Sequence, residues 1–169
     1  ELSRGLGDVY KRQLYDRSMI RKLTFCFKSI YNNFKESHMK VSNEIINIFP
    51  EIKKWRHELH AHPELGYEEE WTSNFVAEKL ESFGLEIHRG MGTTGVVGVL
   101  KGANASLGGG GNKAIGLRAD MDALPMTEEN DFSYKSKFDG RMHACGHDGH
   151  TAMLLGAAKL LSSKKDFDG

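Results

Sequence analysis

The segment AIGLRADMDALP, residues 114–125, joins a short apolar run to two aspartates and a proline. An apolar run such as residues 114–119 is typical of a strand that is covered on both faces of a sheet. Asp120 and Asp122 follow the run, so we expect them near the carboxyl end of the strand, where open α/β sheets bind ligands. Taken alone, the segment is explained equally well by a solvated turn that ends at Pro125.

Two segments upstream also predict strands. Residues 95–100, GVVGVL, form a second continuous apolar run, and residues 85–89, LEIHR, alternate as a short edge strand does. The glycine-rich residues 101–113 predict a flexible surface loop. Its glycosylation sequon at Asn104 would matter only in a secreted protein.

Three segments have the periodicity of helices. Apolar residues recur at helical spacing over residues 45–59, and Pro50 within them predicts either a kink or a restart in a first turn. A second helix is expected over residues 68–84, with three glutamates in its first turn and a glycine as its stop. Residues 150–163 are apolar around most of the helix, which predicts a largely buried element. The fold expected is α/β, a layered sheet with helices on both faces.

Composition narrows the possible partners. The 169 residues include 23 Lys+Arg and 23 Asp+Glu, so the formal net charge is zero and no nucleic-acid or anionic-membrane partner is expected. No apolar run approaches the roughly 20 residues that span a bilayer. Cys26 and Cys145 do not make a disulfide framework, which favours a reducing, cytoplasmic compartment.

Residues 1–38 differ from the rest of the chain. They have no clear apolar period, and LGDVYKRQ within them resembles translated adaptor read-through rather than native sequence. We therefore expect a non-native or disordered leader over residues 1–38, a true start at Met39 or Met19, and one domain over residues 39–169. A native flexible tail is the alternative.

The segment MHACGHDGH, residues 142–150, carries the strongest chemical signal. Cys145 and His147 offer a thiolate and an imidazole two residues apart, a donor pair that suits zinc, cobalt, nickel or iron. Asp148 or a neighbour is expected to cap the following helix. Asp120 and Asp122 could bind the same metal directly or support a metal-bound histidine.

Other interpretations of these residues stay open at this point. The segment could be a polar loop, or Cys145 could be a nucleophile with His147 or His150 as its base. It could also form a closed, non-catalytic zinc site with other histidines. The histidines at 57, 60 and 62 are explained as easily by a solvated helix face as by function.

Three motifs in order give the chain a family resemblance. RHELHAHPELGYEE (56–69), GLRADMDALPM (116–126) and MHACGHDGHTAMLLGAA (142–158) together resemble the M20 metallopeptidase family, specifically its amidohydrolase branch. That branch includes hippurate hydrolases, N-acyl-amino-acid deacylases and auxin-conjugate hydrolases. The resemblance implies an α/β catalytic domain with a lid or dimerisation domain inserted later. Residues 39–169 would then be the truncated N-terminal part of the catalytic domain, and homodimerisation would need the absent lid.

The resemblance also implies a reaction and its residues. Cys145 and His147 would be ligands in a site for two divalent ions, with Zn, Mn, Ni or Co as candidates. Asp122 would be a supporting aspartate, and Asp120 and Asp148 are possible further supports. The implied reaction is hydrolysis of the amide bond of a small N-acyl amino acid. The general base, the first of two adjacent glutamates, would lie beyond Gly169, so this chain alone is expected to be inactive.

Overall fold

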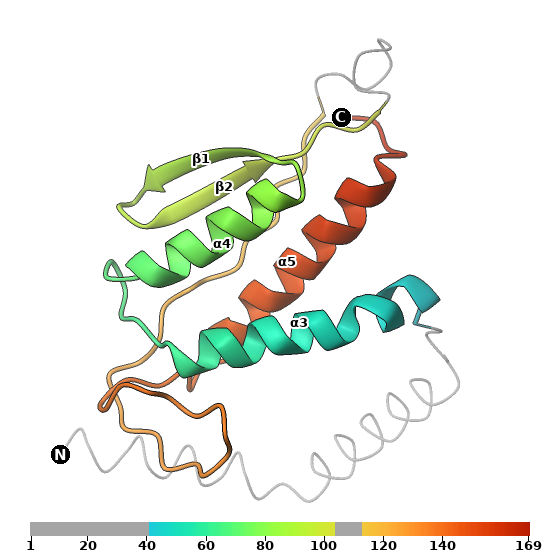
Figure 1. Cartoon of the computed structure of the whole chain (residues 1–169). Coiled ribbons are helices and arrows are strands. Elements are labelled where there is room, and N and C mark those ends of the chain that lie inside the picture. The colour runs from blue at the N-terminus through green and yellow to red at the C-terminus, as the bar shows by residue number, and fades with distance from the viewer. Residues whose placement is uncertain (1–40, 104–112) are drawn as a thin grey trace, which may run out of the picture. The chain divides into compact units, whose positions relative to one another are not determined.

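The structure, a computed structural model, describes residues 41–103 and 113–169 (Figure 1). It contains α3 (Asn43–Ala61), α4 (Glu70–Ser82), β1 (Glu86–Met91), β2 (Gly95–Val99) and α5 (His147–Lys164). This combination of helices and a small sheet confirms the α/β class. The expectations for residues 1–38, Cys26 included, and for the Asn104 sequon fall outside the described residues, and the domain boundary at residue 39 stays a prediction.

Helix α3 confirms the first predicted helix. The hydroxyl of Ser42 accepts a hydrogen bond from the Ile45 amide at 3.4 Å, which satisfies one of the free N–H groups at the start of the helix. The helix continues through Pro50, so the alternative of a restart there is wrong. Because proline has no N–H, one backbone hydrogen bond is missing at that turn.

Helix α4 begins at Glu70, so the prediction of three glutamates in its first turn is wrong. Glu64, in the loop before the helix, supplies the negative charge instead: its carboxylate oxygens accept from the amides of Trp71 and Thr72 at 3.0 and 2.8 Å. An anion at this end is favoured by the helix dipole and by the free amides. Gly84, with φ of +78°, follows the helix as expected.

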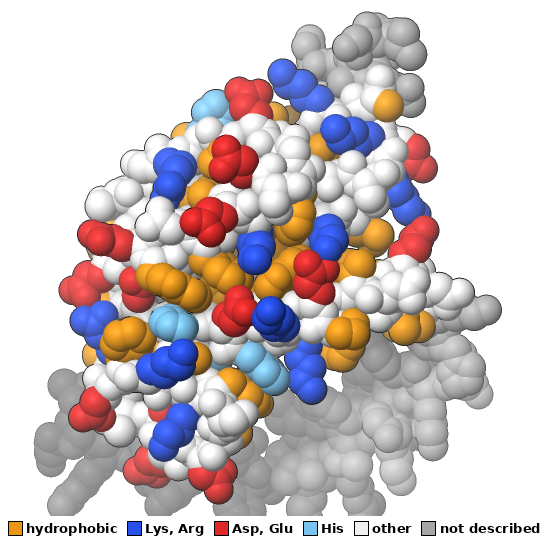
Figure 2. All heavy atoms as spheres, viewed as in Figure 1, with side chains coloured by type: hydrophobic (Ala, Val, Ile, Leu, Met, Phe, Trp, Pro, Cys, Tyr) orange, Lys and Arg blue, Asp and Glu red, His pale blue; other side chains and the backbone are white. Residues whose placement is uncertain are grey.

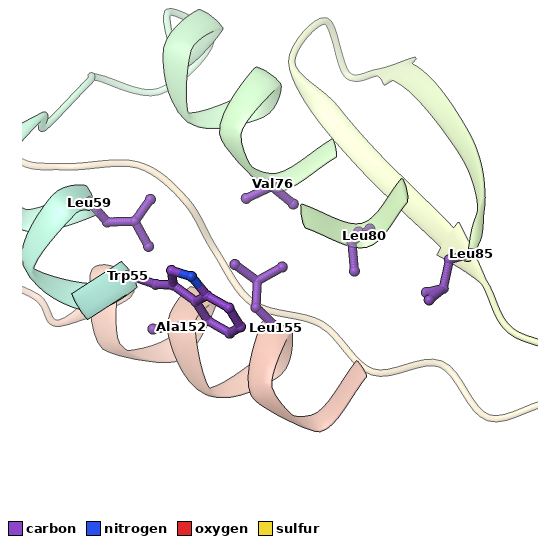
Figure 3. Packing of buried hydrophobic residues seen from close by; sticks show 7 residues of the cluster. All are labelled: Trp55, Leu59, Val76, Leu80, Leu85, Ala152 and Leu155. Atoms are coloured by element: carbon purple, nitrogen blue, oxygen red, sulfur yellow. The ribbon is translucent and has the colours of Figure 1, made fainter. Parts of the chain in front are cut away.

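The strands β1 and β2 form an antiparallel hairpin that confirms the predictions for residues 85–89 and 95–100. Helix α4 packs along it, and α3 crosses α5 (Figure 1). The buried core lies where these elements meet, and Figure 3 shows Trp55 reaching from α3 toward α5. Its members are Trp55, Leu59, Val76, Leu80, Leu85, Ala152 and Leu155.

The predicted strand over residues 114–119 is not formed. Within the described part of the chain this segment pairs with no strand, and Ile115 is 90% and Leu117 61% exposed. Only isolated bridges occur nearby, from Ala123 to Leu65 and from Leu124 to Met142. An apolar run has a preference for a sheet, but a strand forms only where a neighbouring strand supplies hydrogen-bond partners.

Helix α5 begins at His147, three residues earlier than expected, and is buried on one face only. Thr151, Ala152 and Leu155 are buried, whereas Met153 is 61% exposed. The expectation of a largely buried helix is therefore wrong, because among the described residues packing against α5 is confined to one side. No helix in residues 41–103 or 113–169 is both long and apolar enough to span a bilayer.

The surface carries charges of both signs. On the face in Figure 2, basic and acidic side chains alternate around a central group of apolar side chains. This mixture accords with the formal net charge of zero over the whole sequence.

Candidate metal site

The two predicted ligands flank a glycine in a left-handed conformation. Gly146 has φ of +92° and is the N-cap of α5, and His147 is the first residue of the helix. Such a φ strains residues other than glycine, so Gly146 permits the sharp turn from Cys145 into the helix. Cys145 is an exposed free thiol.

We expected Asp148 or a neighbour to cap α5, and the N-cap is a neighbour, Gly146, which makes no side-chain hydrogen bond to the helix. Asp148 lies inside the first turn, and its carboxylate is turned into the protein.

His147 is held by Asp122 through two hydrogen bonds. Its Nδ1 lies 3.0 Å from the Asp122 carboxylate and 3.0 Å from the Asp122 carbonyl oxygen. Both partners accept, so Nδ1 carries the proton, and in the neutral form of the ring the lone pair is on Nε2. An imidazole oriented by a carboxylate in this way is the usual arrangement of a metal-ligating histidine.

Backbone hydrogen bonds bring these two segments together. The Ala123 amide donates to the Glu64 carbonyl at 2.7 Å, and Leu124 and Met142 each donate to the carbonyl of the other, at 2.9 and 3.0 Å. The segment containing Asp122 is thereby fixed between the loop before α4 and the turn before α5. The structure therefore places the aspartate motif next to the histidine motif.

Asp120 is placed differently from Asp122. Its carboxylate pairs with Arg118, and its carbonyl accepts from the Thr151 hydroxyl at 3.0 Å. In residues 41–103 and 113–169, no group of three or more His, Cys, Asp or Glu side chains is placed to hold a metal ion. The described residues thus offer a pair of donors, Cys145 and His147, with Asp122 behind the histidine.

Asp148 belongs to a buried network of charges. One of its carboxylate oxygens lies 2.8 Å from Nδ1 of His60 and 3.2 Å from Nε of Arg56. The other ring nitrogen of His60 lies 3.0 Å from a carboxylate oxygen of Glu128. Glu128 also accepts from the Ser136 amide at 2.6 Å and from Asn130 at 2.8 Å.

Both nitrogens of His60 therefore face a carboxylate, which favours the imidazolium. The hydrogen bond to Asp148 raises the pKa of His60 above its ordinary value of 6.5, against the opposing effect of burial, and Glu128 adds to the rise. Burial works to raise the pKa values of Asp148 and Glu128. The hydrogen bonds that each accepts outweigh burial, so both pKa values are lowered.

His60 is the residue that sequence reasoning missed, because a solvated face explained it as well. Trp55, Leu59 and His60 are all buried, whereas Arg56 remains half exposed beside Asp148. The available signal was helical spacing: His60 adjoins the apolar stripe of α3 and lies one turn after Arg56.

Of three further histidines, two stack on aromatic rings and one is buried without a hydrogen-bond partner. His57 stacks on Tyr134 with 3.6 Å between ring centroids, and His62 stacks on Trp71 at 4.3 Å. His143 is buried without a hydrogen-bond partner on either ring nitrogen, and burial lowers its pKa.

Comparison with known proteins shows what this chain is similar to. Residues 116–169 match the sequence model of Peptidase family M20/M25/M40. Hippurate hydrolase of Campylobacter jejuni is 51% identical over 131 residues, which are 78% of this chain and 32% of that protein. The N-acyl-L-amino acid amidohydrolase of Geobacillus stearothermophilus is 50% identical over 128 residues, 73% of this chain and 33% of that protein. The chain thus spans about a third of the length of these curated relatives.

A solved structure agrees with these matches. The YXEP protein of Bacillus subtilis, described as a dinuclear metal binding peptidase from the M20 family, matches with a TM-score of 0.63 at 39% identity. The match covers 69% of this chain and 31% of that one. These findings confirm the predicted relationship between this chain and the M20 peptidase family.

Proposed function

We propose that this chain is the part of a metal-dependent amidohydrolase that carries two of its metal ligands, and that the whole protein hydrolyses N-acyl amino acids. The observation that carries the proposal is the Asp122–His147 pair, in which the carboxylate lies 3.0 Å from Nδ1 and leaves Nε2 as the ring nitrogen available to a metal, two residues after the exposed Cys145. The activities named for the two curated relatives, hippurate hydrolase and N-acyl-L-amino acid amidohydrolase, support this substrate class.

The donor set fits a transition-metal site. Cys145 and His147 would hold the metal, with Zn, Mn, Ni or Co as candidates and two ions in the complete site. A bound ion of this kind would polarise the scissile carbonyl and acidify a water molecule. Asp122 keeps the proton on Nδ1 and fixes the ring. A closed structural site is the alternative, and it would need further donors besides Cys145 and His147.

Metal binding tests the proposal directly. Titration of the chain with Co²⁺ should produce a thiolate-to-cobalt absorption band, which Cys145→Ser and His147→Gln should abolish. Asp122→Asn should weaken cobalt binding by about 10–100-fold, as loss of a partner behind a ligating histidine does. The matched control is His150→Gln, which alters an exposed histidine on the same turn of α5. A band that persists in Cys145→Ser would contradict the assignment.

Activity provides the second test. The complete reading frame, supplied with a divalent metal, should release the amino acid from N-acetyl amino acids or benzoylglycine. The 169-residue chain should not, because we expect the general base and further ligands beyond Gly169. Metal-dependent hydrolysis by this chain alone would overturn these role assignments. A cytoplasmic location, and a homodimer formed through a lid domain, remain predictions.

A further inference from the structure

The polar network behind the candidate site connects three separate segments. Arg56 and His60 come from α3, Asp148 from the first turn of α5, and Glu128 from the segment before it. Asp148 directly follows His147 in the chain. Whatever fixes the Asp148 side chain therefore also acts on the residue that carries the candidate ligand.

The three central groups are almost completely buried. The side chains of His60, Glu128 and Asp148 are 5%, 2% and 0% exposed. Burying ionised groups is costly unless each finds a partner in good geometry. The network can therefore exist only with Asp148 in a narrow range of positions, and this restricts the rotation and position of the first turn of α5.

Apolar packing does not provide the same restriction. Trp55 and Leu59 of α3 already pack against Ala152 and Leu155 of α5, and this contact holds the two helices together. Buried ion pairs often add little net stability compared with apolar contacts, while they are directional. The ionic network lies beside this apolar contact. It is therefore better suited to fixing the orientation of the first turn of α5 than to holding α3 and α5 together.

We propose that His60 and Glu128 are positioning residues, which act through Asp148 to hold the Cys145–His147 turn in the geometry needed for metal binding. The proposal rests on the proposed function for the role of that turn. It adds residues from α3 and from the segment before the metal motif to the machinery of the site, and it assigns them no contact with the metal.

Amide hydrogen exchange can test this without metal or activity. The amides of Gly149 and His150 donate to the Gly146 carbonyl at 3.0 and 3.1 Å and so report on the turn. In His60→Gln, their exchange should accelerate at least tenfold, while amides near Leu155 keep their protection. The matched control is His57→Gln, on the same helix and stacked on Tyr134, which should leave both amides unchanged.

A second pair of variants covers the case in which His60→Gln does not fold. Glu128→Gln keeps the shape of the side chain and removes only its charge, and Glu129→Gln is the control at the exposed neighbouring position. Glu128→Gln should accelerate exchange at Gly149 and His150, and Glu129→Gln should not. Unchanged exchange in both network variants would overturn the proposal, as would a uniform loss of protection along α5, which would indicate a general structural role.

Cobalt affinity separates this proposal from the proposed function. If the chain binds Co²⁺, His60→Gln and Glu128→Gln should raise the dissociation constant about tenfold, with Cys145 and His147 intact. If the unmodified chain shows no thiolate-to-cobalt band, the proposed function fails for this chain. The exchange rates at Gly149 and His150 then still decide whether the network positions the turn.

Discussion

Helices α3 and α5 meet through two kinds of contact that lie side by side. In one region, Trp55 and Leu59 pack against Ala152 and Leu155 (Figure 3). In the other, Arg56 and His60 reach Asp148 through hydrogen bonds of 3.2 and 2.8 Å. Apolar contact is non-directional, whereas hydrogen bonds weaken steeply when their angles change. We expect the first region to supply net stability. We expect the second to set the orientation of the turn that carries the candidate ligands, and to cost stability when one of its charged partners is removed.

The largest effect is expected from Asp148→Ala, which removes the centre of the polar region. His60 would remain buried without one of its two charged partners, so the free energy of unfolding should fall by about 3–5 kcal/mol. Urea denaturation measures this change. Asp166→Ala, at an exposed position, is the control and should stay within about 0.5 kcal/mol. A loss below about 1 kcal/mol for Asp148→Ala would contradict the importance of this network.

Leu155→Ala tests the apolar region. Leu155 is 2% exposed in the core, so truncation should cost about 3 kcal/mol through lost burial and a residual cavity. Leu161→Ala, at a position that is 42% exposed, should cost much less in the same denaturation experiment. If the two regions act separately, Leu155→Ala should also leave the exchange protection of the Gly149 and His150 amides unchanged relative to the other amides of α5. A selective loss at those two amides would show that the regions are not separable.

Gly156→Ala tests how closely the two helices approach. A Cβ at this position would lie 2.5 Å from Cδ1 of Ile52, so Ile52 must move. Overpacking should outweigh the gain in helix propensity and leave a net loss of about 1 kcal/mol. Adding Ile52→Val should recover most of it. In Gly149→Ala the nearest contact is 3.8 Å, to Nε of Arg56, so that control should be neutral or slightly stabilising.

The smallest effect is expected from a change of pH, which alters the charge of His60 without altering the chain. The raised pKa of His60 means that its stabilising contribution is complete below its ordinary pKa of 6.5 and is lost as pH rises through the folded value. The lowered pKa values of Asp148 and Glu128 mean that their contributions are lost only as pH falls below their ordinary 3.8 and 4.5. The stability difference between the unmodified protein and His60→Gln should therefore be largest between about pH 4.5 and 6.5.

The measurement is a series of urea denaturations across this range, and the difference should shrink above pH 6.5. The groups that face His60 are the carboxylates of Asp148 and Glu128, Arg56 across Asp148, and the buried ring of His143. A difference that is constant from pH 5 to 9 would show that the charge of His60 contributes nothing to stability.

Helical periodicity was enough to predict α3, α4 and α5, because each has an apolar face that shows in the local pattern. The strands over residues 85–89 and 95–100 were predicted from their local patterns, whereas their pairing as a hairpin was not. Cys145 and His147 were identified as a donor pair from their spacing alone. The family resemblance added Asp122 as the supporting aspartate, and the structure places Asp122 against His147.

Contacts between distant residues decided the rest. Residues 95–100 and 114–119 are both apolar runs, yet only the first is paired, since pairing depends on a neighbouring strand and not on composition. Glu64 satisfies the first turn of α4 from outside the helix, so three consecutive glutamates misled the prediction.

The sequence by itself determined which segments are helical and which residues could bind a metal, because these properties reside in local side-chain chemistry. Only the tertiary structure decided that His60 is buried between Asp148 and Glu128, 88 and 68 residues away along the chain. A histidine one turn after an arginine has the same local pattern on a solvated face as in a buried network. The difference arises from the carboxylates that folding brings to it, and no local pattern encodes their positions.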